Sequence, residues 1–197
     1  MASLDPIRVG RATGTPVIVR SARPDDAPAI LAISRSAALT PHTVVEPDEV
    51  AGVALDTARE IDDVTANPQR LWLVAEVDGR VVGELTFSAP RLRRIAHRGR
   101  LGLAVHADHR GQGVGKALIR SLLVWARRHP LIEKVRLGVL SSNTGAIRLY
   151  HRLGFHEEAR RAAEFKIAPG IYADDILMAR WVKPPPGNPP ASTNDPS

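Results

Sequence analysis

The segment 109–123, HRGQGVGKALIRSLL, places Gly111, Gly113, Gly115 and Lys116 before an apolar helical pattern. Glycines allow a ligand to approach the main chain, because they carry no side chain. The free amides at a helix start, with the positive end of the helix dipole, attract anions. The segment therefore predicts a cradle for an anionic group such as a pyrophosphate. The alternative is a glycine-softened turn that binds nothing.

The glycine spacing excludes two common phosphate-binding motifs. A dinucleotide-binding G-x-G-x-x-G needs a third glycine where Lys116 stands. A P-loop needs a glycine where Arg110 stands and a magnesium-binding hydroxyl where Ala117 stands. The pattern that remains is Arg110-x-x-Gly113-x-Gly115.

A second group of residues follows in 139–155, VLSSNTGAIRLYHRLGF. Asn143 is typical of a helix start, and Gly154 is typical of the left-handed residue after a helix end. Tyr150 follows Asn143 by almost two helical turns, so we expect the two side chains to share one face. Taken alone, Tyr150 is typical of a half-buried core residue with its hydroxyl at the rim.

Periodicity and turn residues predict the elements that position these groups. Asp78-Gly79 is a strong hairpin signal between two apolar runs, and apolar alternation leads directly into the glycine segment. Alternating strands and helices with flanking hairpins predict a mixed α/β sheet. We expect strands over 17–22, 71–77, 80–89, 100–105, 134–140, 155–168 and 170–182, and helices over 23–39, 46–64, the segment after Gly113, and 143–153.

Composition sets the broad class of the chain. Apolar residues make up 44% and charged residues 24% of 197 residues, which fits one globular domain. We expect a flexible leader over 1–16, the domain over 17–182 and a disordered, proline-rich tail over 183–197. The lack of cysteine excludes thiolate chemistry and fits the reducing cytoplasm, and neither a signal peptide nor a membrane span is predicted. The net charge of +6 favours an anionic partner.

The order strand, R-x-x-G-x-G, amphipathic helix, strand, N-x-x-A-I-x-L-Y-x-x-L-G-F resembles the Gcn5-related N-acetyltransferase (GNAT) superfamily, most specifically over 101–155. The resemblance implies a central, mostly antiparallel sheet with a splayed parallel pair, flanked by helices. It also implies acetyl-CoA as co-substrate, no metal, and direct transfer of an acetyl group to a primary amine of a small molecule or a protein. The sequence is also compatible with a homodimer.

The resemblance also implies roles for individual residues. The main chain near Leu103 and Val105 would bind the pantetheine arm, and Asn143 would contact it from the other side. Tyr150 would protonate the departing thiolate. The phosphates would be held by Arg110, Gly111, Gln112, Gly113, Gly115 and Lys116.

Several groups are candidates for the base that accepts the proton of the amine. Some family members carry a glutamate where this chain has Gly99. Glu84 and His97 are the nearest substitutes, although each also fits a surface or structural role. A water chain without a dedicated base is a further option, because proximity of the reactants supplies much of the acceleration.

Other polar groups have two interpretations each. The arginines of 89–100 form either a solvated loop or a patch for the coenzyme's ribose phosphate or an anionic macromolecule: Arg91, Arg93, Arg94, Arg98 and Arg100. The acidic residues either lie on an ordinary surface or attract a cationic amine: Glu46, Asp48, Glu49, Asp174 and Asp175. His106, Asp108 and His109 lack zinc-helix spacing, so no metal site is expected. The three tryptophans are expected in the core: Trp72, Trp125 and Trp181.

Two other functions compete with the acetyltransferase. A domain of this type could bind acetyl-CoA without turnover, and Tyr150 argues against that only mildly. A basic nucleic-acid-binding module fits the charge, but 4% aromatic residues and the lack of a stacking motif disfavour it.

Overall fold

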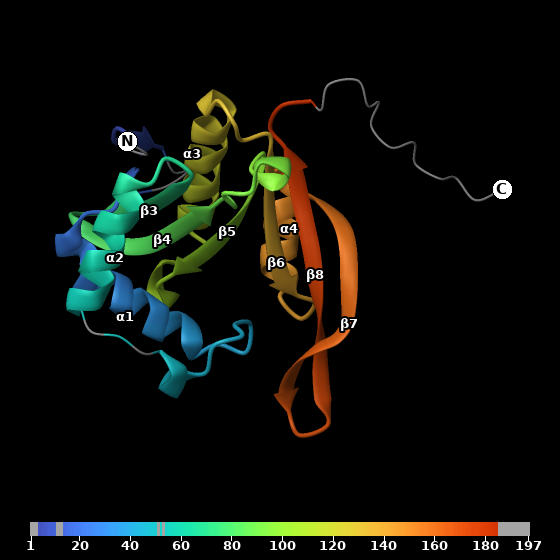
Figure 1. Cartoon of the computed structure of the whole chain (residues 1–197). Helices are drawn as coiled ribbons and strands as arrows, with labels where there is room; N and C mark the ends of the chain where they lie inside the picture. The colour runs from blue at the N-terminus through green and yellow to red at the C-terminus, as the bar shows by residue number, and fades with distance from the viewer. Residues whose placement is uncertain (1–3, 11–13, 51, 53, 185–197) are drawn as a thin grey trace.

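The computed structural model describes residues 4–10, 14–50, 52 and 54–184. In this part of the chain, eight strands form one sheet in the order β1-β2-β3-β4-β5-β6-β8-β7 (Figure 1). Neighbouring strands are antiparallel except for β5 and β6, which are parallel. The predicted mixed sheet with one parallel pair is confirmed. The strands are β1 Ile7–Val9, β2 Val17–Ser21, β3 Arg70–Val77, β4 Arg80–Ser88, β5 Arg98–Val105, β6 Lys134–Leu140, β7 His156–Ala168 and β8 Ile171–Trp181.

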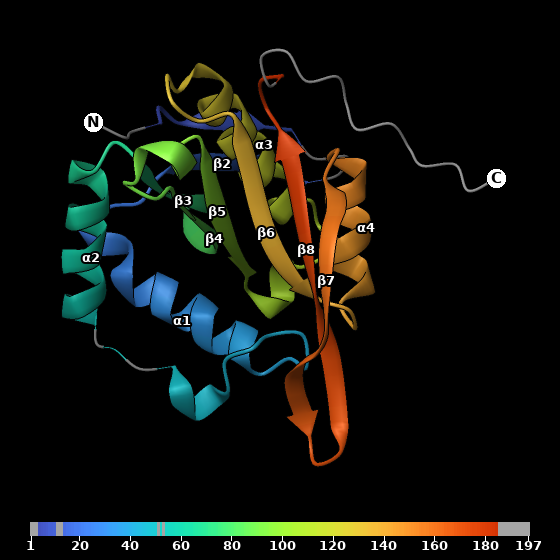
Figure 2. The same ribbon diagram turned by 45° about the vertical axis from the view of Figure 1, so that its right-hand side comes forward.

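Helices cover both faces of the sheet. Figure 2 shows α1 (Ala27–Ala38) and α2 (Ala54–Ala66) on one face, and α3 (Val114–Arg128) and α4 (Thr144–Arg152) on the other. A large apolar core lies on the α3 side and a smaller one beneath α1 and α2. The predicted apolar stripe of α3 is fully in the core: Leu118, Ile119, Leu122, Leu123 and Ala126.

An ion pair fixes the start of α1. Asp26 ends a short 3-10 turn, and Arg20 Nη1 and Nη2 donate to its two carboxylate oxygens at 2.7 and 2.9 Å. The Arg23 amide donates to the same carboxylate at 2.8 Å. Burial alone would raise the pKa of Asp26, but the hydrogen bonds from Arg20 and Arg23 outweigh it and lower the pKa.

The structure corrects parts of the sequence prediction at the chain ends and edges. Within the expected leader, Ile7–Val9 forms β1 and pairs with β2. The helix expected from residue 46 begins at Ala54, because Pro47–Glu49 forms a separate 3-10 turn. Trp72 and Trp125 are buried as predicted, whereas Trp181 is 41% exposed at the end of β8. The expected tail lies outside the described residues beyond residue 184.

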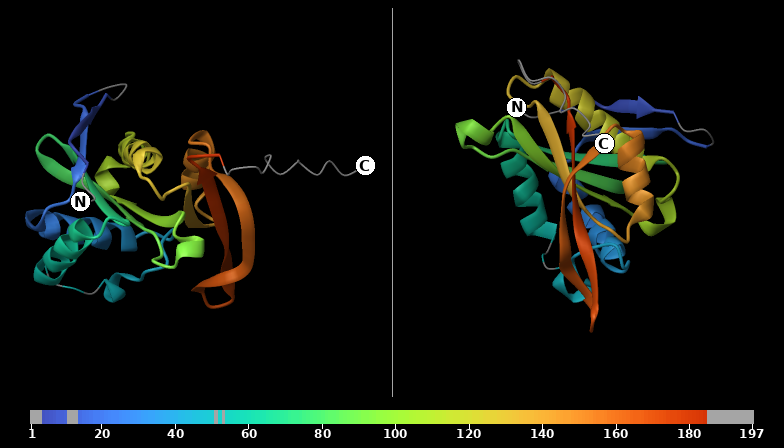
Figure 3. Two further views of the ribbon diagram at one scale, coloured as in Figure 1. Left: turned by 45° about the horizontal axis from the view of Figure 1, so that its top comes forward. Right: turned by 90° about the vertical axis from the view of Figure 1, so that its right-hand side faces the viewer.

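The last two strands form a long hairpin at the edge of the sheet. Both views of Figure 3 show β7 and β8 twisting together at the opposite edge from β1. None of the helices described has both the length and the apolar content that a membrane crossing requires.

Candidate active site

The central strands β5 and β6 part after a short contact. They pair only through Arg98–Arg100 and the facing residues Lys134–Arg136, and then diverge (Figures 1 and 2). We call the space between them beyond this point the gap. A sheet that opens in its middle leaves one edge of each strand without a strand partner. Main-chain groups on these edges are therefore placed to bind a ligand.

Hydrogen-bond alternation shows which groups face the gap. The His106 amide donates to the Val82 carbonyl at 2.9 Å, and the register between β4 and β5 is unbroken. Because bonding direction alternates along an antiparallel strand, the main chain of Leu103 and Val105 is directed away from β4 and toward the gap. The Val105 carbonyl accepts from Arg110 Nε at 3.0 Å, which leaves the Val105 amide and both Leu103 groups facing the gap.

The glycine segment forms an open, uncapped helix start. Helix α3 begins at Val114, directly after Gly113 with φ 87°, and no side chain caps it. Gly111 also has a left-handed φ of 71°, and a Cβ at either glycine would meet no atom within 4 Å. The amides of the first turn thus have no side-chain cap, and the positive end of the helix dipole lies behind them. The predicted start of the helix is confirmed.

The other residues of this segment have distinct positions. Arg110 Nη2 donates to the Ser36 carbonyl at 3.2 Å, so this guanidinium ties the loop to α1. Gln112 Nε2 donates to the Asp108 carbonyl at 2.7 Å. A Cβ at Gly115 would lie 3.4 Å from Leu103 Cδ2, so the helix passes close over β5. Lys116 lines an open cavity on the outer side of the loop with Gln112 and Arg120.

Asn143 and Tyr150 line the gap from the α4 side. Asn143 Oδ1 accepts from the Ala146 amide at 3.1 Å and caps α4, as predicted. The Tyr150 side chain is 7% exposed and packs edge-on against Phe155, with ring centroids 5.9 Å apart. Burial raises the pKa of the Tyr150 phenol to about 12. Both residues line a cavity of about 500 Å³ in the gap, together with Leu103.

The position expected for a glutamate base has no room for one. A Cβ at Gly99 would lie 2.1 Å from Phe87 Cζ. The Phe87 ring is held in place by an edge-on contact with Trp125 at 5.5 Å between centroids. A longer side chain at Gly99 would have to displace this aromatic pair.

The two substitute bases are engaged in other contacts. Glu84 is buried and accepts hydrogen bonds from Ser34 Oγ at 2.9 Å and Trp72 Nε1 at 2.8 Å. Burial raises the pKa of Glu84, and the two hydrogen bonds offset part of this increase. His97 stacks on Trp181 with ring centroids 6.3 Å apart. These contacts fit structural roles.

The predicted acidic group is dispersed. The Glu46 amide donates to the Glu49 carboxylate at 2.9 Å, which closes a turn, and Asp48 lies exposed in the same turn. Asp174 is bound within the hairpin by the Ala163 amide at 3.0 Å. Asp175 alone of these residues is buried, and it lines the gap cavity.

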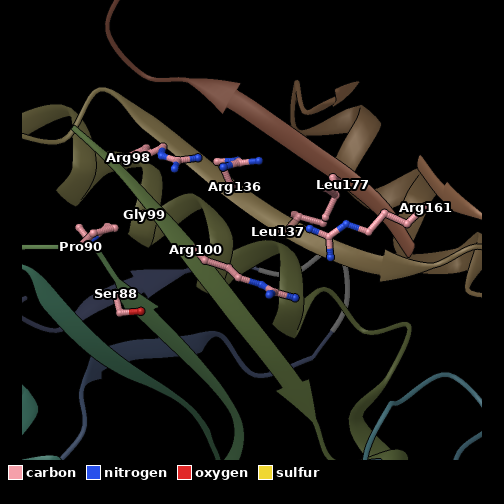
Figure 4. A pocket seen from close by; sticks show the side chains of 10 residues that line it. Ser88, Pro90, Arg98, Gly99, Arg100, Arg136, Leu137, Arg161 and Leu177 are labelled. Carbon is pink, nitrogen blue, oxygen red and sulfur yellow. The ribbon is translucent and has the colours of Figure 1, made fainter. Parts of the chain in front are cut away.

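The arginines predicted as a group share a cavity in part, whereas the histidines form no group of metal ligands. Arg98 and Arg100 line a cavity on the α1 face of the sheet, with Arg136 and Arg161 (Figure 4). Arg136 and Arg161 were not predicted from the sequence, although alternation in 134–140 places Arg136 on the opposite face from its apolar neighbours. His106 Nδ1 lies 3.6 Å from an Asp108 oxygen. Across the residues described, no group of three potential metal ligands is arranged around one point.

Comparison with known proteins agrees with this geometry. Residues 35–155 match the model of the acetyltransferase (GNAT) family. The chain is 32% identical over 108 residues to L-amino acid N-acetyltransferase AaaT of Escherichia coli K12, covering 55% of this chain and 66% of that protein. It is 37% identical over 111 residues to an N-alpha-acetyltransferase of Sulfurisphaera tokodaii, covering 52% and 62%. The matched stretches thus span less than two thirds of either relative.

Solved structures show the same fold. The Salmonella typhimurium protein yncA, solved with its cofactor acetyl-CoA, superposes with a TM-score of 0.75 at 25% identity. The match covers 89% of this chain and 98% of that one. The class of fold is therefore a mixed α/β sheet with a split parallel pair and helices on both faces, shared with the yncA structure. The chain belongs to the acetyltransferase (GNAT) family.

Proposed function

We propose that the chain is an acetyl-CoA-dependent N-acetyltransferase that moves an acetyl group directly to a primary amine of a small molecule or a protein. The gap carries this proposal, because Tyr150 lines it and the uncapped start of α3 passes close to its wall, where a Cβ at Gly115 would lie 3.4 Å from Leu103 Cδ2. Family membership supports it. So do the relatives, two of which are named for N-acetyl transfer while the protein yncA was solved with acetyl-CoA.

The residues of the gap fit the coenzyme in shape and charge. The amides of the glycine segment suit a pyrophosphate, because both left-handed glycines border open space. We assign this contact to Arg110, Gly111, Gln112, Gly113, Gly115 and Lys116, with Arg110 acting through its main chain. The main chain of Leu103 and Val105 would bind the arm, and Asn143 would contact it from α4. When bound, acetyl-CoA supplies an activated acetyl group and a thiolate leaving group.

The chain contributes position and one proton donor to the reaction. The gap holds the amine beside the acetyl group, and such proximity accounts for much of the acceleration in reactions of this kind. Tyr150 donates a hydrogen bond to the sulfur as negative charge builds on it. We assign the proton of the amine to water, because Gly99 has no side chain and both oxygens of Glu84 accept hydrogen bonds. The His97 carbonyl accepts from the amides of Glu133 and Lys134, so His97 lies at the paired end of β5 and away from the gap. The chain has no cysteine, which agrees with direct transfer.

Calorimetry with acetyl-CoA and thiol release from a panel of amines test the proposal. The lack of cysteine means that a thiol reagent reports only the released coenzyme. Coenzyme binding with turnover of at least one amine is the expected result. Binding without turnover of any amine would identify a silent coenzyme-binding domain. Salt-sensitive RNA binding without coenzyme affinity would identify a nucleic-acid-binding module.

A further inference from the structure

Four arginines gather in one cavity beside the gap. The cavity has a volume of about 430 Å³ and is lined by Arg98 and Arg100 of β5, Arg136 of β6 and Arg161 of β7. We call it the arginine cavity. Figure 4 shows the side chains of Arg98, Arg100, Arg136 and Arg161 gathered on one face of the sheet. Strand pairing brings two of them together, because Arg100 is the parallel partner of Arg136, whereas Arg161 comes from β7 on the far side of β8.

Two of these arginines have carboxylate partners. Arg136 Nε lies 3.6 Å from a Glu158 oxygen, and Lys134 contacts the same carboxylate. Arg161 Nη1 lies 3.3 Å from a Glu164 oxygen and 4.0 Å from an Asp175 oxygen. These contacts compensate only part of the positive charge on this face.

The other two have none. Within the described residues, no carboxylate lies at ion-pair distance from Arg98 or Arg100. Like charges on adjacent strands destabilise a sheet. An anion bound between the guanidinium groups would relieve that repulsion. The cavity therefore has the charge, and the forked donors, that a carboxylate or a phosphate requires.

The arginine cavity adjoins the gap. Arg100 and Arg161 line both the arginine cavity and the cavity that contains Tyr150. The lack of a side chain at Gly138 leaves room for Arg100 and Asp175 beside each other. A Cβ at Gly138 would lie 2.9 Å from Arg100 Nη2 and 2.8 Å from Asp175 Oδ1. Positive and negative groups thus lie side by side where the strands part.

We propose that the arginine cavity binds the anionic group, a carboxylate or a phosphate, of the acceptor amine. This inference rests on the proposed function of the gap. The Asp175 carboxylate, 4% exposed and close to Arg100, attracts the ammonium end of the same molecule before it loses its proton. The acceptors are therefore small zwitterions with the acid and the amine a few bonds apart, and simple alkylamines are poor acceptors.

The test measures binding, so that it does not depend on turnover. The chain is saturated with coenzyme A, and matched pairs of ligands are titrated in by calorimetry. One pair is an L-amino acid and its primary amide, taken over a panel of amino acids, and the other is O-phosphoethanolamine and ethanolamine. We expect the acidic member of at least one pair to bind at least about tenfold more tightly, the loss typical of one hydrogen bond between charged groups. The pair that shows the difference identifies carboxylate or phosphate.

Variants connect the preference to the cavity. Arg98→Gln combined with Arg136→Gln should remove the preference for the acidic member and leave the affinity for coenzyme A unchanged. Arg98→Lys keeps the positive charge but removes the paired N–H donors of the guanidinium. It should therefore reduce the preference for the acidic member less than the double variant does. Arg93→Gln combined with Arg94→Gln removes two exposed arginines outside the cavity and serves as the control.

Three results would overturn the inference. The first is equal affinity for acidic and neutral members of every pair. The second is a preference for the acidic members that survives in the double variant while the melting temperature shows a folded protein. The third is arginine-dependent RNA binding in place of amine binding. If an acidic amine binds through these arginines but no thiol is released, the subsite stands and the proposed transferase function fails.

Discussion

Tyr150→Phe removes a single oxygen from the gap and tests the central step of the mechanism. Burial raises the pKa of this phenol to about 12, so only roughly one molecule in 10⁵ has lost the proton at pH 7. The neutral phenol is thus available as a donor throughout the physiological range. The wild-type rate should show no decline from Tyr150 ionisation between about pH 9 and pH 11, because the raised pKa moves that ionisation above this window.

The raised pKa of Tyr150 also sets the expected loss of turnover in Tyr150→Phe. A thiol has a pKa near 8.5, so complete proton transfer from a phenol of pKa about 12 is uphill by roughly 5 kcal/mol. Tyr150 therefore acts mainly through a hydrogen bond to the sulfur. Removing a single donor of this kind costs about 10²–10³-fold in turnover. We expect Tyr150→Phe to lose rate within that range and to keep its affinity for acetyl-CoA.

Thiol release at saturating acetyl-CoA measures the rate, and calorimetry measures coenzyme binding. Tyr172→Phe is the matched control, because Tyr172 is the other tyrosine of the chain and is 55% exposed on the β7–β8 hairpin. Equal turnover of Tyr150→Phe and wild type from pH 7 to pH 10 would refute the role of Tyr150. A loss confined to coenzyme affinity would refute it equally.

Two further substitutions test the proposed phosphate contact of the glycine segment and the ion pair at the start of α1. Gly113→Asp should weaken acetyl-CoA binding at least about tenfold by calorimetry, because it puts a negative charge where the phosphates bind. Gly79→Asp has a similar left-handed φ and equally open surroundings, so it should cause similar strain without changing affinity; equal effects would contradict the cradle. Asp26→Asn should lower the free energy of unfolding by about 2 kcal/mol at pH 7, because it breaks a largely buried ion pair. Because the pKa of Asp26 is lowered in the folded chain, wild type loses this stability as the pH falls below about 4. The free energies of unfolding of Asp26→Asn and wild type should therefore converge at low pH. Asp25→Asn, at an exposed neighbour, should melt like wild type in denaturant titrations, and a pH-independent difference for Asp26→Asn would contradict the argument.

Local signals allowed much of the framework to be predicted. Asp78 and Gly79 both adopt a positive φ, as a tight hairpin turn between two twisted strands requires. Asn143 caps α4 and Gly154 follows it with a φ of 75°. In each case the signal depends on residues close together in the sequence, so the chain carries it without information about the tertiary structure.

The features that were missed depend on distant parts of the chain. Arg136 and Arg161 reach one cavity only through the pairing of β6, β8 and β7, where the register shifts several times. Trp181 is exposed because it lies at the end of β8, where it stacks on His97. β1 has three residues, too few to show an apolar alternation in the sequence.

The contact between Gly99 and Phe87 limits how this protein can acquire a new catalytic group. Protein engineers who wish to install a carboxylate there must first exchange Phe87 for a smaller residue. That exchange would also remove the partner of Trp125 and leave a void under α3, at a typical loss of about 3–5 kcal/mol for a phenylalanine truncated to alanine. Most natural domains are stable by only about 5–15 kcal/mol, so stabilising changes elsewhere would have to come first.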